Sequence, residues 1–118
     1  MAQGIIIKTQ IQGIHKWTGV TQHFDLQNVS FLQYPHFHIF HIKCKKYVSH
    51  SDRDIEIIDL KLKIDNYLHN TYYNDELGYC IFNQMSCEML ATELVNCFNL
   101  DYCEVLEDGN FGGFCEIG

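Results

Sequence analysis

The amino-acid sequence predicts an α+β fold with the element order ββααββ. Apolar and polar residues alternate over much of the first 48 positions, as is typical of strands, and a helical apolar period takes over after residue 54. Near the end of the chain, two short strand-like runs flank Asp108-Gly109-Asn110, a strong signal for a hairpin turn. We therefore expect a four-stranded antiparallel sheet with two helices on one face.

Two long strands are expected in the first half of the chain, at residues 4–14 and 36–48. Isoleucines alternate with lysine, threonine and glutamine in the first strand, and apolar residues and histidines alternate in the second. Residues 18–35 are polar and rich in turn formers, and they end at the only proline of the chain. We interpret them as a long loop that joins two antiparallel strands.

The second half of the chain begins with two expected helices. Asp54 is the expected N-cap of the first helix and Ser86 that of the second, and residues 69–85 between the helices are interpreted as a connecting loop. Two short strands follow at residues 101–106 and 112–117. The apolar stripes that predict the helices consist of Ile57, Leu60, Ile64, Tyr67 and Leu68 in the first, and of Leu90, Ala91, Leu94, Val95 and Phe98 in the second.

Composition limits the class of protein. The 118 residues, 47% of them hydrophobic and 14% aromatic, suit one folded domain that spans residues 1–118. A net charge of -7 argues against binding to duplex nucleic acid, which favours basic surfaces. The six cysteines form no C-x-x-C pair, no secretory leader is apparent, and no apolar run approaches the ~20 residues that span a bilayer. We expect reduced thiols and a cytoplasmic protein without a membrane partner.

Three histidines carry the main functional signal. His36 and His38 share one face of the second strand, together with Phe40 and Ile42, whereas His41 faces the other way. An antiparallel partner would bring His15 towards this pair. Three neutral imidazoles can hold Zn²⁺ and leave a fourth position open for water or a ligand oxygen. The alternative is that these histidines are packed or hydrogen-bonded and share a face by accident.

Several short motifs, in this order along the chain, resemble the tunnelling-fold (T-fold) proteins, in the branch of 6-pyruvoyl-tetrahydropterin synthase and 6-carboxytetrahydropterin synthase. The resemblance covers most of the chain in the order of its elements. By this resemblance, the chain is similar to a small, diverged family member of the kind found in phage genomes. The similar segments are Ile14 to Trp17 and Pro35 to His38 around the zinc histidines, Ile58 to Lys61 in the first helix, Ser86 to Ala91 at the second helix start, and Val105 to Asp108.

The resemblance implies a T-fold-like domain and a set of site residues. It assigns zinc to His15, His36 and His38, and it makes Glu107 the carboxylate that accepts paired hydrogen bonds from the amino-pyrimidinone edge of a pterin, an edge that guanine shares. Glu88 is the second acidic candidate for ligand binding, although an acid in a first helical turn also has a structural reason to be there. By the same analogy we expect a trimer or hexamer whose site a neighbouring subunit completes.

Two departures from the family leave enzyme activity open. The family enzymes carry a cysteine four residues before the first histidine of the pair, where this chain has Leu32. They also carry an Asp-His pair after the first helix, where this chain offers only Asp65 and, four residues later, His69. His69 is the first candidate for the missing catalytic acid or base, and its alternative is a solvent-facing histidine at a helix end. His41 or a neighbouring subunit is the other possible source of this group.

Three functions are therefore compatible with the sequence. The first is a diverged, zinc-dependent synthase or lyase of pterin or deazapurine chemistry. The second is a phage protein without catalysis that binds or sequesters a purine-containing nucleotide signal, with the lysine run Lys43, Lys45 and Lys46 on a phosphate. The third is a structural homo-oligomer without a ligand, since a sheet with helices on one face leaves the other face to be covered.

Overall fold

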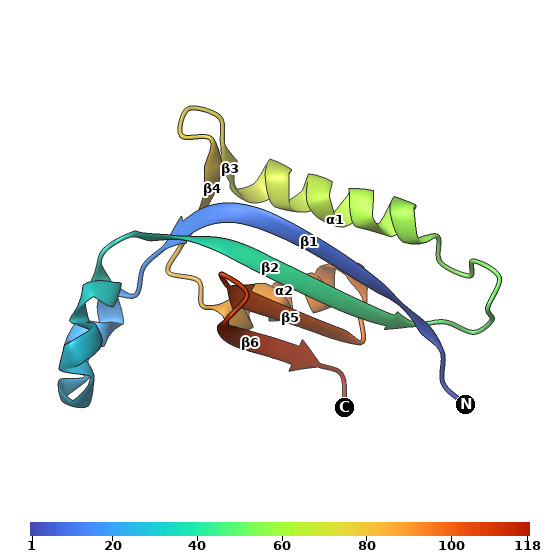
Figure 1. Cartoon of the computed structure of the whole chain (residues 1–118), viewed down its shortest axis with the longest axis horizontal. Helices are drawn as coiled ribbons and strands as arrows, with labels where there is room; N and C mark the ends of the chain where they lie inside the picture. Colours follow the sequence, from blue (N-terminus) through green and yellow to red (C-terminus); the bar gives the residue numbers. More distant parts are fainter.

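The computed structural model describes all 118 residues and contains a six-stranded mixed sheet with the strand order β3-β4-β1-β2-β5-β6 (Figure 1). The α+β class is confirmed, whereas the predicted sheet of four antiparallel strands is incomplete. The strands are β1 (Gly4–His15), β2 (His36–Tyr47), β3 (Tyr73–Asn74), β4 (Tyr79–Asn83), β5 (Tyr102–Glu107) and β6 (Phe111–Glu116), and the α-helices are α1 (Ile57–Tyr72) and α2 (Cys87–Phe98).

The long strands β1 and β2 form the centre of the sheet and run antiparallel along their whole length, from Gly4 opposite Tyr47 to His15 opposite His36. Their bounds lie within a residue of the predicted ones. β5 pairs with β2 and β6 pairs with β5, both antiparallel. The four strands expected from the sequence are thus adjacent to one another, in the order β1-β2-β5-β6.

The prediction of a plain loop at residues 69–85 was wrong. The first helix continues to Tyr72, and the remaining residues form the hairpin of β3 and β4, whose second strand pairs with β1 in parallel at Gly13 to His15. The hairpin escaped notice because β3 has only two residues and β4 only five, too few to show a clear period. Cys80 and Phe82 are nevertheless buried on one side of β4, as expected of a half-buried strand.

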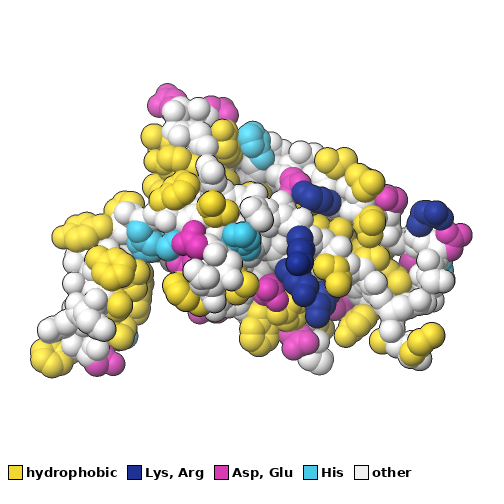
Figure 2. Space-filling model, in the orientation of Figure 1, with side chains coloured by type: hydrophobic (Ala, Val, Ile, Leu, Met, Phe, Trp, Pro, Cys, Tyr) yellow, Lys and Arg dark blue, Asp and Glu magenta, His cyan; other side chains and the backbone are white.

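Residues 18–35 are also more ordered than the predicted loop. Two 3-10 segments, η1 (Thr18–Gln22) and η2 (Phe24–Gln33), pack on each other and form an arm that reaches away from the sheet (Figure 1). These segments were not predicted because 3-10 turns are short and the arm has almost no amphipathic pattern. Val20 is the only buried residue of η1, η2 has none, and apolar side chains stand exposed along the arm (Figure 2).

The core lies between one face of the sheet, called here the inner face, and both α-helices. Phe40 and Ile42 of β2 point into it, as their alternation predicts. Four of the six cysteines are buried and none is in a disulfide. No helix combines the length and the apolar character needed to cross a membrane. The buried cluster consists of Ile7, Phe40, Ile42, Cys44, Ile64, Leu68, Cys80, Phe82, Cys87, Leu90, Ala91, Leu94, Val95, Leu100, Cys103 and Val105.

The N-cap residue predicted from the sequence is confirmed for α2 but not for α1. Ser86 caps α2 as predicted, because its hydroxyl accepts a hydrogen bond from the Met89 N–H at 3.1 Å. The cap of α1 is Glu56, whose carboxylate accepts from the Asp59 N–H, and not Asp54. The Asp54 carboxylate instead accepts from the backbone and hydroxyl of Ser49, so it closes the preceding turn.

Replacing Ser86 with alanine is expected to lower the free energy of unfolding by about 1 kcal/mol, the usual effect of losing an N-cap side chain. Urea denaturation followed by circular dichroism measures this difference. Ser30→Ala, in the exposed part of the arm, is the matched control and should change stability by less than about 0.5 kcal/mol. Equal stability of Ser86→Ala and the unchanged protein would show that the cap contributes nothing.

Candidate metal centre

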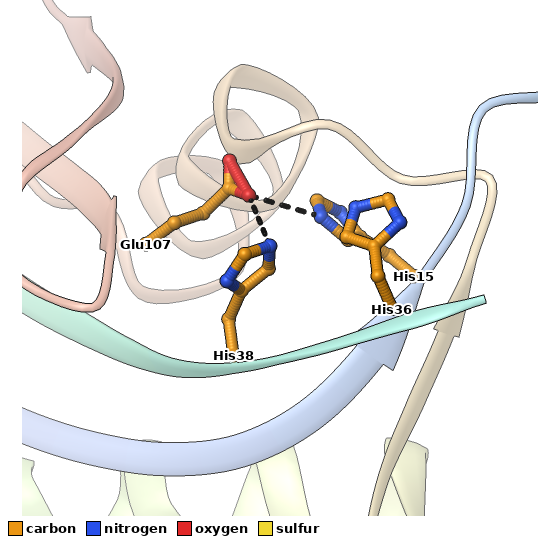
Figure 3. Close-up of side chains that lie close together, drawn as sticks. All are labelled: His15, His36, His38 and Glu107. Atoms are coloured by element: carbon orange, nitrogen blue, oxygen red, sulfur yellow. Dashed lines mark hydrogen bonds and ion pairs between the residues drawn. The ribbon is translucent and has the colours of Figure 1, made fainter. Parts of the chain in front are cut away.

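Four potential metal ligands meet at one end of the sheet. His15 ends β1, His36 and His38 begin β2, and Glu107 ends β5, and one ligand atom from each lies within 4.8 Å of all the others (Figure 3). The three imidazole ring centres are 4.5 to 5.5 Å apart. The structure thus brings together the three histidines and the glutamate that the sequence singled out.

Strand register explains this convergence. His15 lies directly opposite His36, and Glu107 lies opposite Phe40, which is the next inward-facing residue after His38. Directly opposed residues of antiparallel strands have side chains on the same face, about 4.5–5.5 Å apart at Cβ. Three neighbouring strands therefore present their ligands on the inner face, where the apolar core ends.

The outward nitrogen of each histidine faces an oxygen atom. The distances from Nδ1 are 2.8 Å to the Met85 carbonyl for His15, and 2.9 Å to the Tyr34 carbonyl for His36. For His38 the partner is a carboxylate oxygen of Asp108, at 2.8 Å. Carbonyls and carboxylates only accept hydrogen bonds, so each neutral ring can donate from Nδ1 to these oxygens. In that tautomer the Nε2 lone pairs could bind a metal.

Glu107 faces the Nε2 atoms of two of the three rings. Its Oε1 atom is 3.2 Å from His15 Nε2 and 2.7 Å from His38 Nε2 (Figure 3). With the ring protons on Nδ1, these contacts would set nitrogen lone pairs against a carboxylate oxygen, which is repulsive. Either an added proton on a ring or a metal ion between the groups resolves the repulsion. The donor set of three imidazoles and one carboxylate fits Zn²⁺, which binds such N and O ligands at about 2.0–2.2 Å.

Burial and neighbouring charges shift the pKa values of the residues in this cluster in opposite directions. Burial lowers the pKa of His15, but its hydrogen bonds to Glu107 and to the Met85 carbonyl outweigh this effect, and the pKa is raised above 6.5. Burial is the main reason that the pKa of His36 is lowered. The hydrogen bond with His15 is the main reason that the pKa of Glu107 is lowered. Glu107 is therefore ionised near neutral pH, ready to face a cation.

A cavity of about 540 Å³ adjoins the cluster. Glu88, the second acidic candidate, lies on its wall at the start of α2. Leu32 also lines the cavity, so the site does contain the position at which the resembling enzymes have a cysteine. The other residues of the wall are His15, Lys16, Trp17, His36, Gln84, Met85, Ser86, Cys87, Met89, Glu107, Phe111 and Gly112.

Two sequence-predicted groups lie elsewhere in the chain. His69 stacks on Tyr73 with ring centres 4.4 Å apart and lines a different groove, beside α1 and β1. Lys43 and Lys45 alternate with the inward residues of β2 and therefore occupy the outer face, where Figure 2 shows a group of Lys and Arg side chains. Lys46 is on the inner face but donates to the Asn99 carbonyl. The lysine run therefore does not act as one phosphate contact beside Glu107 in the same chain.

Sequence reasoning missed two residues at the site. Cys87 is buried with its Sγ 3.7 Å from Glu107 Oε2, so a thiol does stand here, although it comes from α2. Burial is the main reason that the pKa of Cys87 is raised to about 12. Asp108 was interpreted as a turn residue at the end of the segment Val105 to Asp108, with no role at the histidines. Neither contact could be found from spacing, because 20 residues separate Cys87 from Glu107 and 70 separate His38 from Asp108.

Comparison with known proteins identifies no family: no family model matches the chain, and no curated protein is similar enough to match.

Proposed function

We propose that the protein binds one zinc ion through His15, His36 and His38, with Glu107 as the fourth donor in the ligand-free protein. The observation that carries this proposal is the orientation of the three rings: every Nδ1 faces an oxygen acceptor, the Nε2 atoms of His15 and His38 both contact Glu107 Oε1, and one ligand atom from each of the four residues lies within 4.8 Å of the others. Outer hydrogen bonds of this kind fix the tautomer of metal-binding histidines. Simple packing of histidines requires no such arrangement.

The proposed ligand is a small pterin, deazapurine or purine-like heterocycle in the adjoining cavity. Its volume of about 540 Å³ falls in the usual range for small-molecule sites. Trp17 and Phe111 offer apolar walls, and Glu88 and Glu107 offer hydrogen-bond acceptors for ring and amino N–H groups. The choice of this ligand class rests on the T-fold resemblance. Two features support that resemblance: β1, β2, β5 and β6 are adjacent antiparallel strands, and α1 and α2 lie in sequence between the pair β1-β2 and the pair β5-β6.

Binding without turnover is favoured over a synthase or lyase reaction. Leu32 provides no acid or base where the resembling enzymes have a cysteine, and His69 lines a different groove of the same chain. A proton relay of the family type is thus not assembled within one chain. A phage protein that captures a purine-containing nucleotide fits this arrangement, provided that groups other than Lys43 and Lys45 contact its phosphate.

Assembly into a homo-oligomer is part of the same proposal. The outer face of the sheet exposes Ile6, Phe37, Ile39 and Phe114, with no helix of the chain over them. A partner that covers this face would meet Lys43 and Lys45, which follow Ile39 on the same face with Lys45 opposite Ile6, and it would bury these apolar side chains. A trimer or hexamer would cover them and could bring a neighbour's residues to the cavity. Light scattering of the purified protein measures this state directly.

The experiment that tests the proposed ligand is mass spectrometry of the molecules released when freshly purified protein is denatured. We expect a heterocycle of the pterin or purine class, retained by the unchanged protein and lost from Glu107→Gln, whose single amide oxygen cannot take the two parallel N–H bonds that a carboxylate accepts. Competition with guanosine and pterin standards then ranks the two classes. If neither class is released and neither binds the zinc-loaded protein, the ligand proposal fails.

Zinc affinity is expected to fall as the pH is lowered. His15 must lose its proton to bind the metal, and its pKa is raised above 6.5 because the contacts with Glu107 and Met85 outweigh burial. Below that pKa, protons compete with zinc, and one competing proton weakens binding roughly tenfold per pH unit. Titration against a chelator between pH 5.5 and 8 measures the effect. An affinity that stays constant across this range would exclude His15 as a ligand.

A further inference from the structure

The hairpin turn between β5 and β6 carries an acidic residue that bonds to β2 through three separate contacts. Asp108 has a φ of 56° and Gly109 a φ of 74°, so the turn uses the left-handed backbone region that Asp and Gly tolerate. The Asp108 N–H donates to the Ile39 carbonyl at 2.8 Å, and the Ile39 N–H donates back to Asp108 Oδ1 at 2.9 Å. These two bonds fix the turn beside β2.

The third contact reaches the metal centre. With the turn fixed, the second carboxylate oxygen of Asp108 lies 2.8 Å from Nδ1 of His38. The opposite nitrogen of the same ring, Nε2, lies 2.7 Å from Glu107. His38 is thus held between two carboxylates, whereas His15 and His36 have neutral carbonyls at Nδ1.

We propose that Asp108 is a positioning residue that holds His38 in the Nδ1–H tautomer and aims its Nε2 at the metal, as a carboxylate–histidine–metal triad. A carboxylate at Nδ1 also makes the imidazole a stronger donor than a carbonyl does. Together, Asp108 and Glu107 bring two negative charges, which balance a divalent cation bound by three neutral rings. This inference rests on the proposed zinc centre.

A structural role alone would give Asp108 a different signature. If it only fixed the turn to Ile39, an asparagine would serve equally well, because its amide oxygen can still accept from the Ile39 N–H. The amide nitrogen would then face His38 Nδ1 as a donor. The neutral ring could keep this contact only by moving its proton to Nε2, which would block the metal ligand. Asp108→Asn therefore separates positioning of the ring from fixation of the turn.

The experiment combines two measurements on Asp108→Asn. Nitrogen-15 NMR of metal-free protein at pH 8, in a Glu107→Ala background that removes the competing acceptor at Nε2, reports which nitrogen of His38 carries the proton. A chelator competition on Asp108→Asn alone reports zinc affinity. We expect the proton on Nδ1 where Asp108 is present and on Nε2 where it is replaced by asparagine, with zinc affinity reduced about 10–100-fold. Thermal unfolding of the metal-free protein should change little.

Asp101→Asn is the matched control. The Asp101 carboxylate also fixes β2, by accepting from the Tyr47 N–H at 2.7 Å, but it lies at the other end of the strand. Its replacement should leave zinc affinity and the His38 tautomer unchanged. An Asp108→Asn protein with the original tautomer and the original zinc affinity would overturn the inference. Failure of the unchanged protein to bind zinc would instead overturn the proposed function, and the tautomer would still decide whether Asp108 positions the ring.

Discussion

Replacing His36 and His38 together with alanine is expected to weaken zinc binding by roughly three to four orders of magnitude. Four-ligand zinc sites bind with about 10–16 kcal/mol in total, so each ligand carries a substantial share. The two rings begin β2 and contribute two of the four ligand atoms, so only His15 and Glu107 of the cluster would remain. Chelator competition with a fluorescent zinc indicator measures the loss.

The matched control is His41→Ala in the same strand. His41 faces the outer side of the sheet and lies beside the turn at Gly109, away from the cluster. We expect its zinc affinity to equal that of the unchanged protein. Similar losses in both variants would mean that zinc binds elsewhere or that the substitutions act by unfolding β2, and circular dichroism distinguishes these two cases.

The largest expected effect on stability is that of Phe82→Ala, which should lower the free energy of unfolding by about 3–5 kcal/mol. Phe82 is 2% exposed and packs edge-on against Phe40 and at a tilt against Tyr72, with ring centres 5.0 and 4.9 Å apart. It also covers Gly13, where a Cβ atom would stand only 2.6 Å from the Phe82 ring. Removing the ring leaves a cavity that this tightly packed region cannot easily fill.

Phe24→Ala provides the comparison, because the same ring on the arm is 86% exposed. Its removal should change stability by less than about 0.5 kcal/mol. Urea denaturation of both variants, with the slope of the transition compared, measures the two effects. If Phe82→Ala and Phe24→Ala were equally mild, β4 would not belong to the core as the structure describes it.

The sequence predicted those parts of the fold that have a clear period. Alternation in β1 and β2 located both strands to within a residue, and it placed His36 and His38 on the face of Phe40 and Ile42, which the structure shows to be the core face. The hairpin of β3 and β4 and the 3-10 arm were missed because short segments give no period from which to recognise them. The parallel pairing of β4 with β1 is a tertiary feature that local sequence does not encode.

The candidate site was predictable in its ligands but not in their surroundings. Strand alternation accounts for the histidine pair, and the resemblance to the T-fold family pointed to Glu107. The oxygen atoms that face Nδ1 of each histidine depend on long-range register, as does the thiol of Cys87 beside Glu107. His69 is a residue that the sequence suggested for the site and that the structure places outside it. Its side chain lines a different groove, beside α1 and β1.

The most direct test of the metal centre is a zinc titration of chelator-treated, metal-free protein, followed by elemental analysis after exhaustive dialysis. The proposed centre predicts one zinc ion per chain with a dissociation constant below about 1 μM, since one ligand atom from each of three imidazoles and a carboxylate already lies within 4.8 Å of the others. A folded protein that retains no zinc, or that binds it with equal affinity after His36 and His38 are replaced, would contradict the account.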